Sequence, residues 1–250
     1  MSDALLHVNR VTVDYEGYKA LDDLTFGVDA GAIQVLIGPN GAGKSTLLDT
    51  IIGRVRPTSG QIVFKGEDIS RLPEHQIVRR GICRKFQTPG VLESLTIEEN
   101  LAVAASRKRS AFHALRTRSG NGERHRVAEV LAMIGLQAKS RLLAAHLSHG
   151  EKQWLEIGMV VAADPDLLLL DEPAAGMTHR EAEETARLIR SLAGKHACVV
   201  IDHDMDFVAQ LAAPVSVLHM GRLIAHGSIE QVRNDQNVVD VYLGRTKAAA

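Results

Sequence analysis

The amino-acid sequence predicts an α/β fold in which helices cover a mostly parallel β-sheet. The first observation is that short β-rich runs alternate with helical patterns along most of the 250 residues, as in proteins built from strand–helix–strand units. Each run is bounded by Gly, Pro or Asp, and the runs are Gln34–Ile37, Ile62–Phe64, Leu167–Leu170, Cys198–Ile201 and Val215–Leu218. The second observation is that Glu181–Ala193 carries apolar or small residues at the spacing of one helical face, which predicts a helix packed on the sheet.

The third observation is that strand signals give way to helical ones in the middle of the chain. Helices are expected there at Ile97–Ala105, at Arg124–Ile134 and after Ser148. We interpret residues 88–163 as a helical subdomain inserted into an α/β core of residues 1–87 and 164–250, within one domain. The insertion contains the basic segment Arg107–Arg126, which is either a solvated surface or a contact with a membrane partner or lipid head groups.

Composition narrows the class of protein. The formal net charge of −1 gives no electrostatic reason to expect nucleic acid as a partner. Cys83 and Cys198 lie in apolar, strand-like runs and are expected to be buried, reduced thiols. No run approaches the roughly 18 consecutive apolar residues that read as a membrane-spanning helix, and the start of the chain is not of the signal-peptide type. We therefore expect a cytoplasmic protein whose link to a membrane comes through another chain.

A glycine-rich loop carries the strongest motif. The segment QVLIGPNGAGKSTLLDTIIG matches GxxxxGK[ST], and it follows an apolar strand and precedes a helical pattern, as the motif requires. Glycines let backbone N–H groups converge on phosphate oxygens, and the helix start adds its positive end to the anion site. Lys44 is expected to reach the β- and γ-phosphates and the Ser45 hydroxyl to ligate Mg²⁺. The predicted nucleotide-binding residues in this loop are Gly38, Asn40, Gly41, Gly43, Lys44, Ser45 and Thr46.

Polar residues at the ends of other predicted strands extend this site. Asp171 and Glu172 follow the run LLLL, and adjacent carboxylates at the end of a buried strand suit metal chemistry. We expect Asp171 to hold Mg²⁺ and Glu172 to polarise the attacking water. His203 follows the strand CVVID and should sense the γ-phosphate. Gln87 ends the apolar segment ICRKF, where its amide is expected to contact Mg²⁺ or the water and to link nucleotide state to the helical subdomain.

With these residues in place, the chain resembles the ATP-binding cassette (ABC) family over nearly its whole length. The segment LSHGEKQ at Leu147–Gln153 is similar to that family's signature, LSGGQ. The resemblance implies a P-loop NTPase of the ABC type, with a mostly parallel sheet core, a β-rich N-terminal part and an inserted helical subdomain. It also implies that two chains sandwich two ATP molecules head to tail. Ser148, Gly150 and their helix start would then contact the ATP of the opposite subunit, and Tyr15, or else Tyr18, would stack on adenine.

The sequence departs from the family pattern in three places, and the first two concern contacts across that dimer. His149 replaces a signature Gly, and Glu151 replaces the usual Gln. The segment Ala174–Met177, AAGM, lacks the SALD sequence that many members use to communicate between subunits, and Asp202 stands where Glu is frequent. Dimer formation is still expected, with altered contacts at these positions.

The resemblance also indicates a branch of the family. EPAAGM and the closing NDQNVVDVYLGR resemble the ATPases of branched-chain amino-acid-type importers, and FQTPGVLESLTIEENL and LSHGEKQWLEIGM are more similar to the urea importer subunit. We therefore expect an ATP hydrolase that energises import of urea or short amides. The alternatives are import of branched-chain or other amino acids, and an ABC ATPase in iron–sulfur cluster assembly. For an importer, the implied partners are polytopic permease subunits, a second ATPase subunit and, indirectly, a periplasmic solute-binding protein, at the inner face of the plasma membrane.

Overall fold

The six-stranded sheet at the centre of the fold is mostly parallel. The computed structural model describes residues 4–85, 90–106 and 121–242. In this sheet the strand order is β10-β9-β3-β8-β7-β6; all neighbours pair in parallel except β9 and β10, which are antiparallel. The strands are β3 (Ile33–Ile37), β6 (Ile82–Lys85), β7 (Leu167–Asp171), β8 (Ala197–Ile201), β9 (Val215–His219) and β10 (Arg222–Gly227). Every residue of β3, β7 and β8 is buried, which is the pattern of a parallel sheet covered on both faces.

A second sheet is antiparallel, and it takes one run that the sequence pattern had placed among the parallel strands. Its order is β2-β1-β4-β5, formed by β1 (Ala4–Tyr15), β2 (Tyr18–Asp29), β4 (Ser59–Phe64) and β5 (Glu67–Asp68). Residues 62–64 pair with β1 in this sheet. Buried and more exposed residues alternate along β1, as they do in antiparallel sheets with one covered face. The short apolar run 62–64 looks the same in either kind of sheet, which explains the difference.

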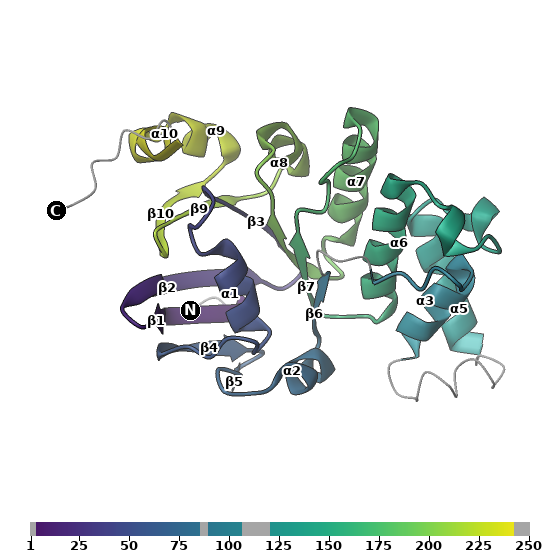
Figure 1. The fold of residues 1–250 in the computed structure, drawn as a ribbon, viewed down its shortest axis with the longest axis horizontal. Helices are drawn as coiled ribbons and strands as arrows, with labels where there is room; N and C mark the ends of the chain where they lie inside the picture. The colour runs from purple at the N-terminus through teal and green to yellow at the C-terminus, as the bar shows by residue number, and fades with distance from the viewer. Residues whose placement is uncertain (1–3, 86–89, 107–120, 243–250) are drawn as a thin grey trace.

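Helices cover both faces of the central sheet (Figure 1). On one face α1 (Lys44–Ile51) lies between the two sheets, and its Leu47, Leu48 and Ile51 are fully buried in a cluster with residues of both. The other face packs against α7 (His179–Leu192) and α8 (Met205–Leu211). The remaining described helices are α2 (Glu74–Arg80), α3 (Ile97–Ala105), α5 (Asn121–Met133), α6 (His149–Ala162), α9 (Ile229–Asn234) and α10 (Gln236–Tyr242), with short 3₁₀ turns at Gln137–Lys139 and Ala144–His146.

The helical stretch expected in the middle of the chain is present. Between residues 90 and 163, the described part of the chain forms helices and a single isolated bridge, Thr96 to Leu143. The helix α3 has the predicted bounds, and α5 begins three residues before the expected Arg124 and ends one residue before Ile134. Figure 1 shows α3, α5 and α6 together at one end of the molecule. The basic segment lies outside the described residues up to residue 120; in the described part, Arg126 donates hydrogen bonds to Val161 O and Asp164 Oδ1, both at 2.8 Å.

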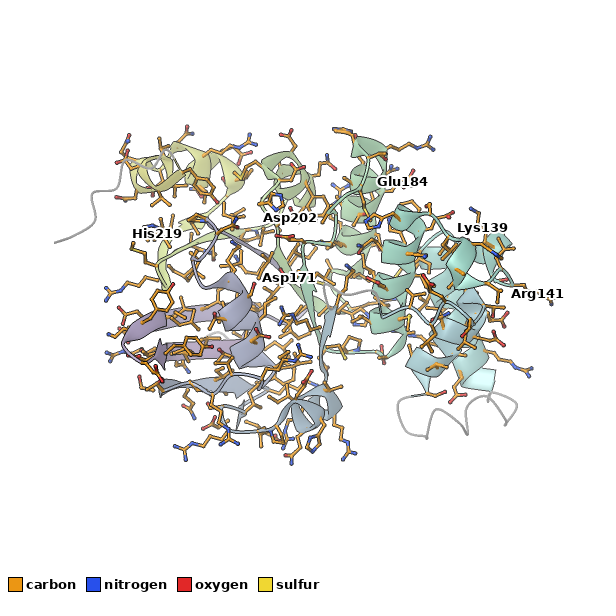
Figure 2. All side chains as sticks on the ribbon, in the orientation of Figure 1. Lys139, Arg141, Asp171, Glu184, Asp202 and His219 are labelled. Carbon is orange, nitrogen blue, oxygen red and sulfur yellow. The ribbon has the colours of Figure 1, made fainter. Side chains whose placement is uncertain are left out.

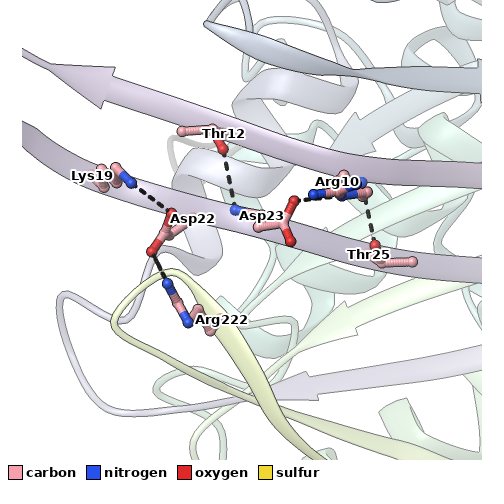
Figure 3. A network of polar contacts seen from close by, with 7 residues as sticks. All are labelled: Arg10, Thr12, Lys19, Asp22, Asp23, Thr25 and Arg222. Carbon is pink, nitrogen blue, oxygen red and sulfur yellow. Dashed lines mark hydrogen bonds and ion pairs between the residues drawn. The ribbon is translucent and has the colours of Figure 1, made fainter.

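A polar network joins the antiparallel sheet to the hairpin of β9 and β10 (Figure 3). The Arg222 Nε donates to Asp22 Oδ2 at 2.9 Å, and Lys19 Nζ donates to Asp22 Oδ1 at 3.0 Å. Hydrogen bonds from Arg222 and then Lys19 hold the pKa of Asp22 below its ordinary value. Next to them, Arg10 Nε donates to Asp23 Oδ1 at 2.9 Å. The Arg222–Asp22 contact connects residues 200 positions apart, so it positions the hairpin against β2.

Both cysteines are buried and neither forms a disulfide, as expected. Burial raises the pKa of the Cys198 thiol to about 12, so this residue is a packing group and not a nucleophile. No helix among the described residues is long and apolar enough to cross a membrane.

One buried ion pair connects the central sheet to the helical end of the molecule. Lys85, the last residue of β6, lies 3.3 Å from Glu156 Oε2 on α6, and the two side chains are 3% and 6% exposed. Burial raises the pKa of Glu156, and the neighbouring ammonium of Lys85 opposes that change. A buried pair of this kind is costly to break from one side, because the remaining charge is left without a partner.

We predict that Glu156→Gln lowers the free energy of unfolding by about 3 to 5 kcal/mol, because it leaves the Lys85 ammonium buried without a counter-charge. Urea unfolding followed by circular dichroism measures this change. The matched control is Lys152→Met, which removes the exposed pair that the same helix makes with Glu93 at 2.7 Å and should cost less than about 1 kcal/mol. Equal losses in the two variants would contradict the importance of burial.

Candidate functional site

The phosphate loop lies between the end of β3 and the start of α1, and the space around it requires glycine at two of its positions. Gly38 has φ 155°, and a Cβ there would lie 2.2 Å from Leu218 O. Gly43, the residue before the first turn of α1, has φ 107°, and a Cβ there would lie 2.4 Å from Ala20 O. Both positions therefore exclude a side chain, for reasons of backbone conformation and of space. The close approach of Leu218 and Ala20 shows that β9 and β2 shape the loop from outside.

Lys44 lies over the loop that precedes it. Its Nζ donates hydrogen bonds to the carbonyl oxygens of Gly38 (2.7 Å) and Pro39 (3.0 Å). Partial burial lowers the pKa of Lys44, and the negative charges of Glu172 and Asp171 oppose this shift. The ammonium is thus held in the loop by backbone contacts and lies within reach of the field of the acidic pair.

A cavity of about 350 Å³ brings the predicted residues together. It is lined by Tyr15, Tyr18, Ala20, Asn40, Gly41, Ala42, Gly43, Lys44, Ser45, Thr46, Asp171 and Glu172. Tyr15 and Tyr18 are 49% and 61% exposed, so both aromatic rings are available at the surface beside the loop. The cavity therefore combines the start of a helix, a lysine, two carboxylates and aromatic surface, which is the chemistry needed to bind a nucleotide.

A larger cavity, of about 680 Å³, lies at the opposite ends of the strands. Its lining includes Ile33 and Gln34 at the start of β3, together with Pro214 and Arg190. It contains none of the residues of the phosphate loop and neither member of the acidic pair. In parallel α/β sheets ligands bind at the carboxyl ends of the strands, so we place the functional site at the smaller cavity.

Asp171, the last residue of β7, is held by an arginine that the sequence pattern did not single out. The Arg84 Nη2 donates to Asp171 Oδ2 at 2.9 Å, and its Nη1 donates to Asp49 Oδ1 at 2.6 Å. Arg84 and Asp171 are 8% and 4% exposed. The one signal in the sequence is that two basic residues, Arg84 and Lys85, interrupt the apolar run ICRKF. Figure 2 shows Asp171 near the centre of the molecule, with Asp202 close by.

Glu172 and His203 lie beside each other because β7 and β8 are neighbours. Asp171 pairs with Ile201, and the Glu172 N–H donates to Ile201 O at 2.8 Å. Glu172 has φ 47°, a left-handed conformation that non-glycine residues adopt mainly where the surroundings enforce it. Its Oε1 lies 3.5 Å from His203 Nδ1, and the His203 side chain is 70% exposed. The pair therefore reaches from the sheet edge toward solvent.

Asp202 holds the backbone of the turn that carries His203. Its Oδ1 accepts hydrogen bonds from the backbone N–H groups of His203 (2.8 Å) and Asp204 (3.0 Å). Burial raises the pKa of Asp202, against the effect of these two backbone donors. Its Oδ2 has no hydrogen-bond partner among the described residues. The aspartate that replaces the family's frequent glutamate thus serves as a backbone anchor for the turn that carries His203.

The signature segment begins α6, and its unusual Glu151 has a structural role. Ser148 Oγ accepts a hydrogen bond from Glu151 N at 3.2 Å, and Glu151 Oε2 accepts one from Ser148 N at 3.0 Å. This reciprocal arrangement is a capping box that satisfies two free N–H groups at the helix start. Burial favours a higher pKa for Glu151, but Lys139 and Ser148 outweigh it, and the pKa is lowered.

His149 and Gly150 connect α6 to the segment after Glu172. The His149 Nε2 lies 3.1 Å from Ala175 O, so it donates when that nitrogen carries the proton. A Cβ on Gly150 would lie 2.3 Å from Glu181 Oε1, at the start of α7. Met177 is also anchored, because its Sδ accepts a hydrogen bond from Thr185 Oγ1 at 3.1 Å. The departures at His149 and Met177 therefore have partners within this chain.

The structure separates the predicted residues into two groups. Ser148 and Gly150 are absent from the lining of the phosphate-loop cavity. They lie instead where the starts of α6 and α7 meet. Gln87 lies outside the described residues. One chain thus brings the loop, the acidic pair and His203 together, and presents the signature at a different place.

The phosphate loop lies between a parallel strand and a helix, and the paired Asp–Glu follows β7 at the same edge of the sheet. Together with the capped signature helix, these features define an ATPase of the cassette class. Comparison with known proteins agrees, because residues 21–175 match the ABC transporter family. The chain belongs to this family: it is an ABC-type transport ATPase, an ATP-binding subunit of an ABC transporter.

Relatives and solved structures resemble the whole chain. The high-affinity branched-chain amino acid transport ATP-binding protein LivG of Escherichia coli (strain K12) is 34% identical over 253 residues, covering 98% of this chain and 99% of LivG. The protein BraF of Pseudomonas aeruginosa, which has the same description, is 34% identical over 257 residues with the same coverage. The crystal structure of the ADP conformation of an ATP-binding cassette of an ABC transporter has a TM-score of 0.85 at 28% identity, covering 97% of this chain and 100% of that one.

We predict that Gly150→Ala lowers the free energy of unfolding by about 1 kcal/mol, because the added methyl displaces the Glu181 carboxylate that caps α7 together with Thr178. In a Glu181→Ala background the same change should cost nothing further. A double-mutant cycle measured by thermal unfolding gives the coupling. Gly122→Ala in α5 is the control, because an added methyl there meets nothing within 4 Å. Additive effects of Gly150→Ala and Glu181→Ala would contradict the assigned contact.

Proposed function

We propose that this chain binds and hydrolyses MgATP at the phosphate-loop cavity to energise an importer of branched-chain or other amino acids. The observation that carries the solute class is the full-length similarity to LivG and BraF, whose names state branched-chain amino acid transport. The urea interpretation rests on two segments of sequence, and the named relatives favour the amino-acid alternative over it.

The phosphate loop binds the phosphates in this proposal. Backbone N–H groups of Gly38–Thr46 face the phosphate oxygens, and Lys44 moves its ammonium from the carbonyls of Gly38 and Pro39 to the β- and γ-phosphates. The exposed ring of Tyr15, with Tyr18 as the alternative, stacks on adenine. The polar lining of the cavity, with Asn40 and Gly41 beside it, supports this assignment.

Ser45 and Asp171 fit a magnesium site that is completed by the nucleotide. Both line the cavity and supply oxygen ligands, which Mg²⁺ prefers. Within the described residues no cluster of three His, Cys, Asp or Glu side chains could hold a metal by itself. This agrees with the usual Mg²⁺ arrangement of one or two protein oxygens plus substrate phosphates. When bound, the ion would neutralise charge that develops on the phosphates.

Glu172 is the proposed base and His203 the proposed γ-phosphate sensor. The 3.5 Å separation between Glu172 Oε1 and His203 Nδ1 supports a shared position beside the terminal phosphate. The carboxylate of Glu172 then orients and deprotonates the attacking water. Gln87, two residues after the end of β6, contacts the water or Mg²⁺ in this proposal and transmits nucleotide state to the helical subdomain, residues 88–163.

The complete site is proposed to need two ATPase subunits, either identical or different. Ser148 and Gly150 lie away from the cavity of their own chain, and the start of α6 offers backbone N–H groups to an anion. In a head-to-tail dimer these groups would meet the ATP of the opposite subunit. Permease subunits would hold the dimer at the inner face of the plasma membrane, and a periplasmic solute-binding protein would deliver the solute.

We predict that Glu172→Gln lowers the turnover number for ATP hydrolysis by roughly 10² to 10⁴-fold, the range expected for loss of a general base. ATP affinity should stay unchanged, because the amide keeps the size of the carboxylate. Phosphate release measures turnover, and fluorescence titration measures affinity. Lys44→Ala is the contrasting variant, in which ATP binding itself weakens. Wild-type turnover in Glu172→Gln would remove Glu172 from its assigned role.

We predict that leucine stimulates ATP hydrolysis by the reconstituted transporter and that urea does not. The experiment places this chain in liposomes with its permease subunits and the solute-binding protein, and compares phosphate release with either solute. The Glu172→Gln variant gives the background rate. Stimulation by urea alone would reverse the solute assignment and leave the ATPase assignment intact.

A further inference from the structure

Arg84 connects the two elements that carry the proposed metal ligands. It lies in β6, next to β7, and its guanidinium donates to Asp171 Oδ2 at the end of β7 and to Asp49 Oδ1 on α1. The helix α1 begins at Lys44 and includes Ser45. One side chain thus spans the gap between the helix that follows the phosphate loop and the strand that ends in the acidic pair.

The contact is buried, so its geometry matters. Arg84 and Asp171 are 8% and 4% exposed, whereas Asp49 is 31% exposed. A charged group at such depth is costly unless it is paired and hydrogen-bonded. Arginine suits the position because its planar fork can hold two carboxylates in fixed directions, which a lysine cannot do. Arg84 is therefore well placed to hold Asp171 and α1 in a fixed relation.

The hydrogen-bond pattern leaves one oxygen of Asp171 available. Arg84 donates a hydrogen bond to Oδ2 of the Asp171 carboxylate. Among the described residues, no side chain donates a hydrogen bond to the other oxygen, Oδ1. The Arg84 Nε is buried and has no partner within the same residues. An unpaired buried N–H costs free energy. Arg84 thus contacts two carboxylates, Asp49 and Asp171, while its own Nε–H stays without a hydrogen-bond partner among the described residues.

We propose that Arg84 is a positioning residue for the metal: it fixes the direction of the Asp171 carboxylate and its separation from Ser45. This inference rests on the proposed function, in which Ser45 and Asp171 hold Mg²⁺. Arg84 does not touch the nucleotide or the metal. Its positive charge alone would weaken cation binding, so the proposal requires that orientation outweighs repulsion.

The test compares Arg84→Lys and Arg84→Met with wild type by binding of Mn²⁺, used as a probe for Mg²⁺, in the presence of a non-hydrolysable ATP analogue. Electron paramagnetic resonance of free Mn²⁺ gives the dissociation constant. We expect both variants to raise it about 10- to 100-fold, the usual effect of losing a hydrogen bond to a charged group. Analogue binding in EDTA should stay unchanged. The Mg²⁺ concentration for half-maximal ATP hydrolysis should rise in parallel, with turnover recovering at saturating Mg²⁺.

Arg80→Met is the matched control, because Arg80 makes an exposed pair with Glu67 on the surface, at 2.9 Å. It should bind Mn²⁺ as wild type does. If Arg84→Met fails to fold, as judged by urea unfolding, Arg84→Lys and Asp49→Asn still decide the question. Asp49→Asn should shift Mn²⁺ binding in the same direction by a smaller factor, because the amide oxygen can still accept a hydrogen bond from Arg84.

Two outcomes would overturn the inference about Arg84. Wild-type Mn²⁺ affinity in Arg84→Lys would show that the fork is not needed, and tighter binding in Arg84→Met would show that Arg84 acts only by charge repulsion. Asp171→Asn separates this inference from the proposed function. If Asp171→Asn weakens Mn²⁺ binding and Arg84→Lys does not, only the role of Arg84 fails. If Asp171→Asn binds Mn²⁺ as wild type does, the metal site itself is wrong.

Discussion

The parallel hydrogen-bonded ladder of β3, β8 and β7 is the constraint on which the site depends. Leu36 and Asp171 both pair with Ile201 of β8, which lies between the other two strands. The three strands therefore end at the same edge, and the chain segments that follow them must leave there. A shift of one residue in this register would turn the side chains at the strand ends to the opposite face. Every residue of these strands is buried, so both faces of this part of the sheet are covered by other elements.

Packing of α1 converts this edge into a rigid phosphate loop. The helix is held between two sheets by fully buried Leu47, Leu48 and Ile51. Its start is shaped by Leu218 and Ala20, whose carbonyl oxygens leave no room for a side chain on Gly38 or Gly43. Close packing of this kind transmits small displacements instead of absorbing them. The phosphate loop and the acidic pair are therefore held in fixed positions relative to each other, by the packing of α1 and by the contacts of Arg84.

The signature segment shows how unusual residues can be accommodated by their own chain. Glu151 completes the capping box with Ser148, and His149 reaches Ala175 O. Gly150 leaves room for Glu181, which caps the neighbouring helix. Two helix starts are joined by these contacts, and the segment after Glu172 lies between them. The segment after Glu172 is therefore in direct contact with the helix start that is proposed to face a second subunit.

Several features could be predicted because they depend on local sequence. The apolar runs gave the positions of β3, β7, β8 and β9 within a few residues, and apolar spacing gave α3 and α7. The phosphate-loop residues from Asn40 to Thr46 and the acidic pair line one cavity, as their motif and strand-end positions indicated. Gln87 lies outside the described residues, so its role stays a prediction.

The sequence by itself determined the positions of β3, β7, β8 and β9, of α3 and α7, and of the phosphate loop, because backbone conformation and burial periodicity are set by neighbouring residues. Only the tertiary structure decided which strands pair, since the run 62–64 fits a parallel or an antiparallel neighbour equally well. The same holds for Arg84, whose partner Asp171 is 87 positions away. Contacts between residues so far apart in the sequence depend on how the sheet and helices pack. They cannot be predicted from the residue pattern of a single segment.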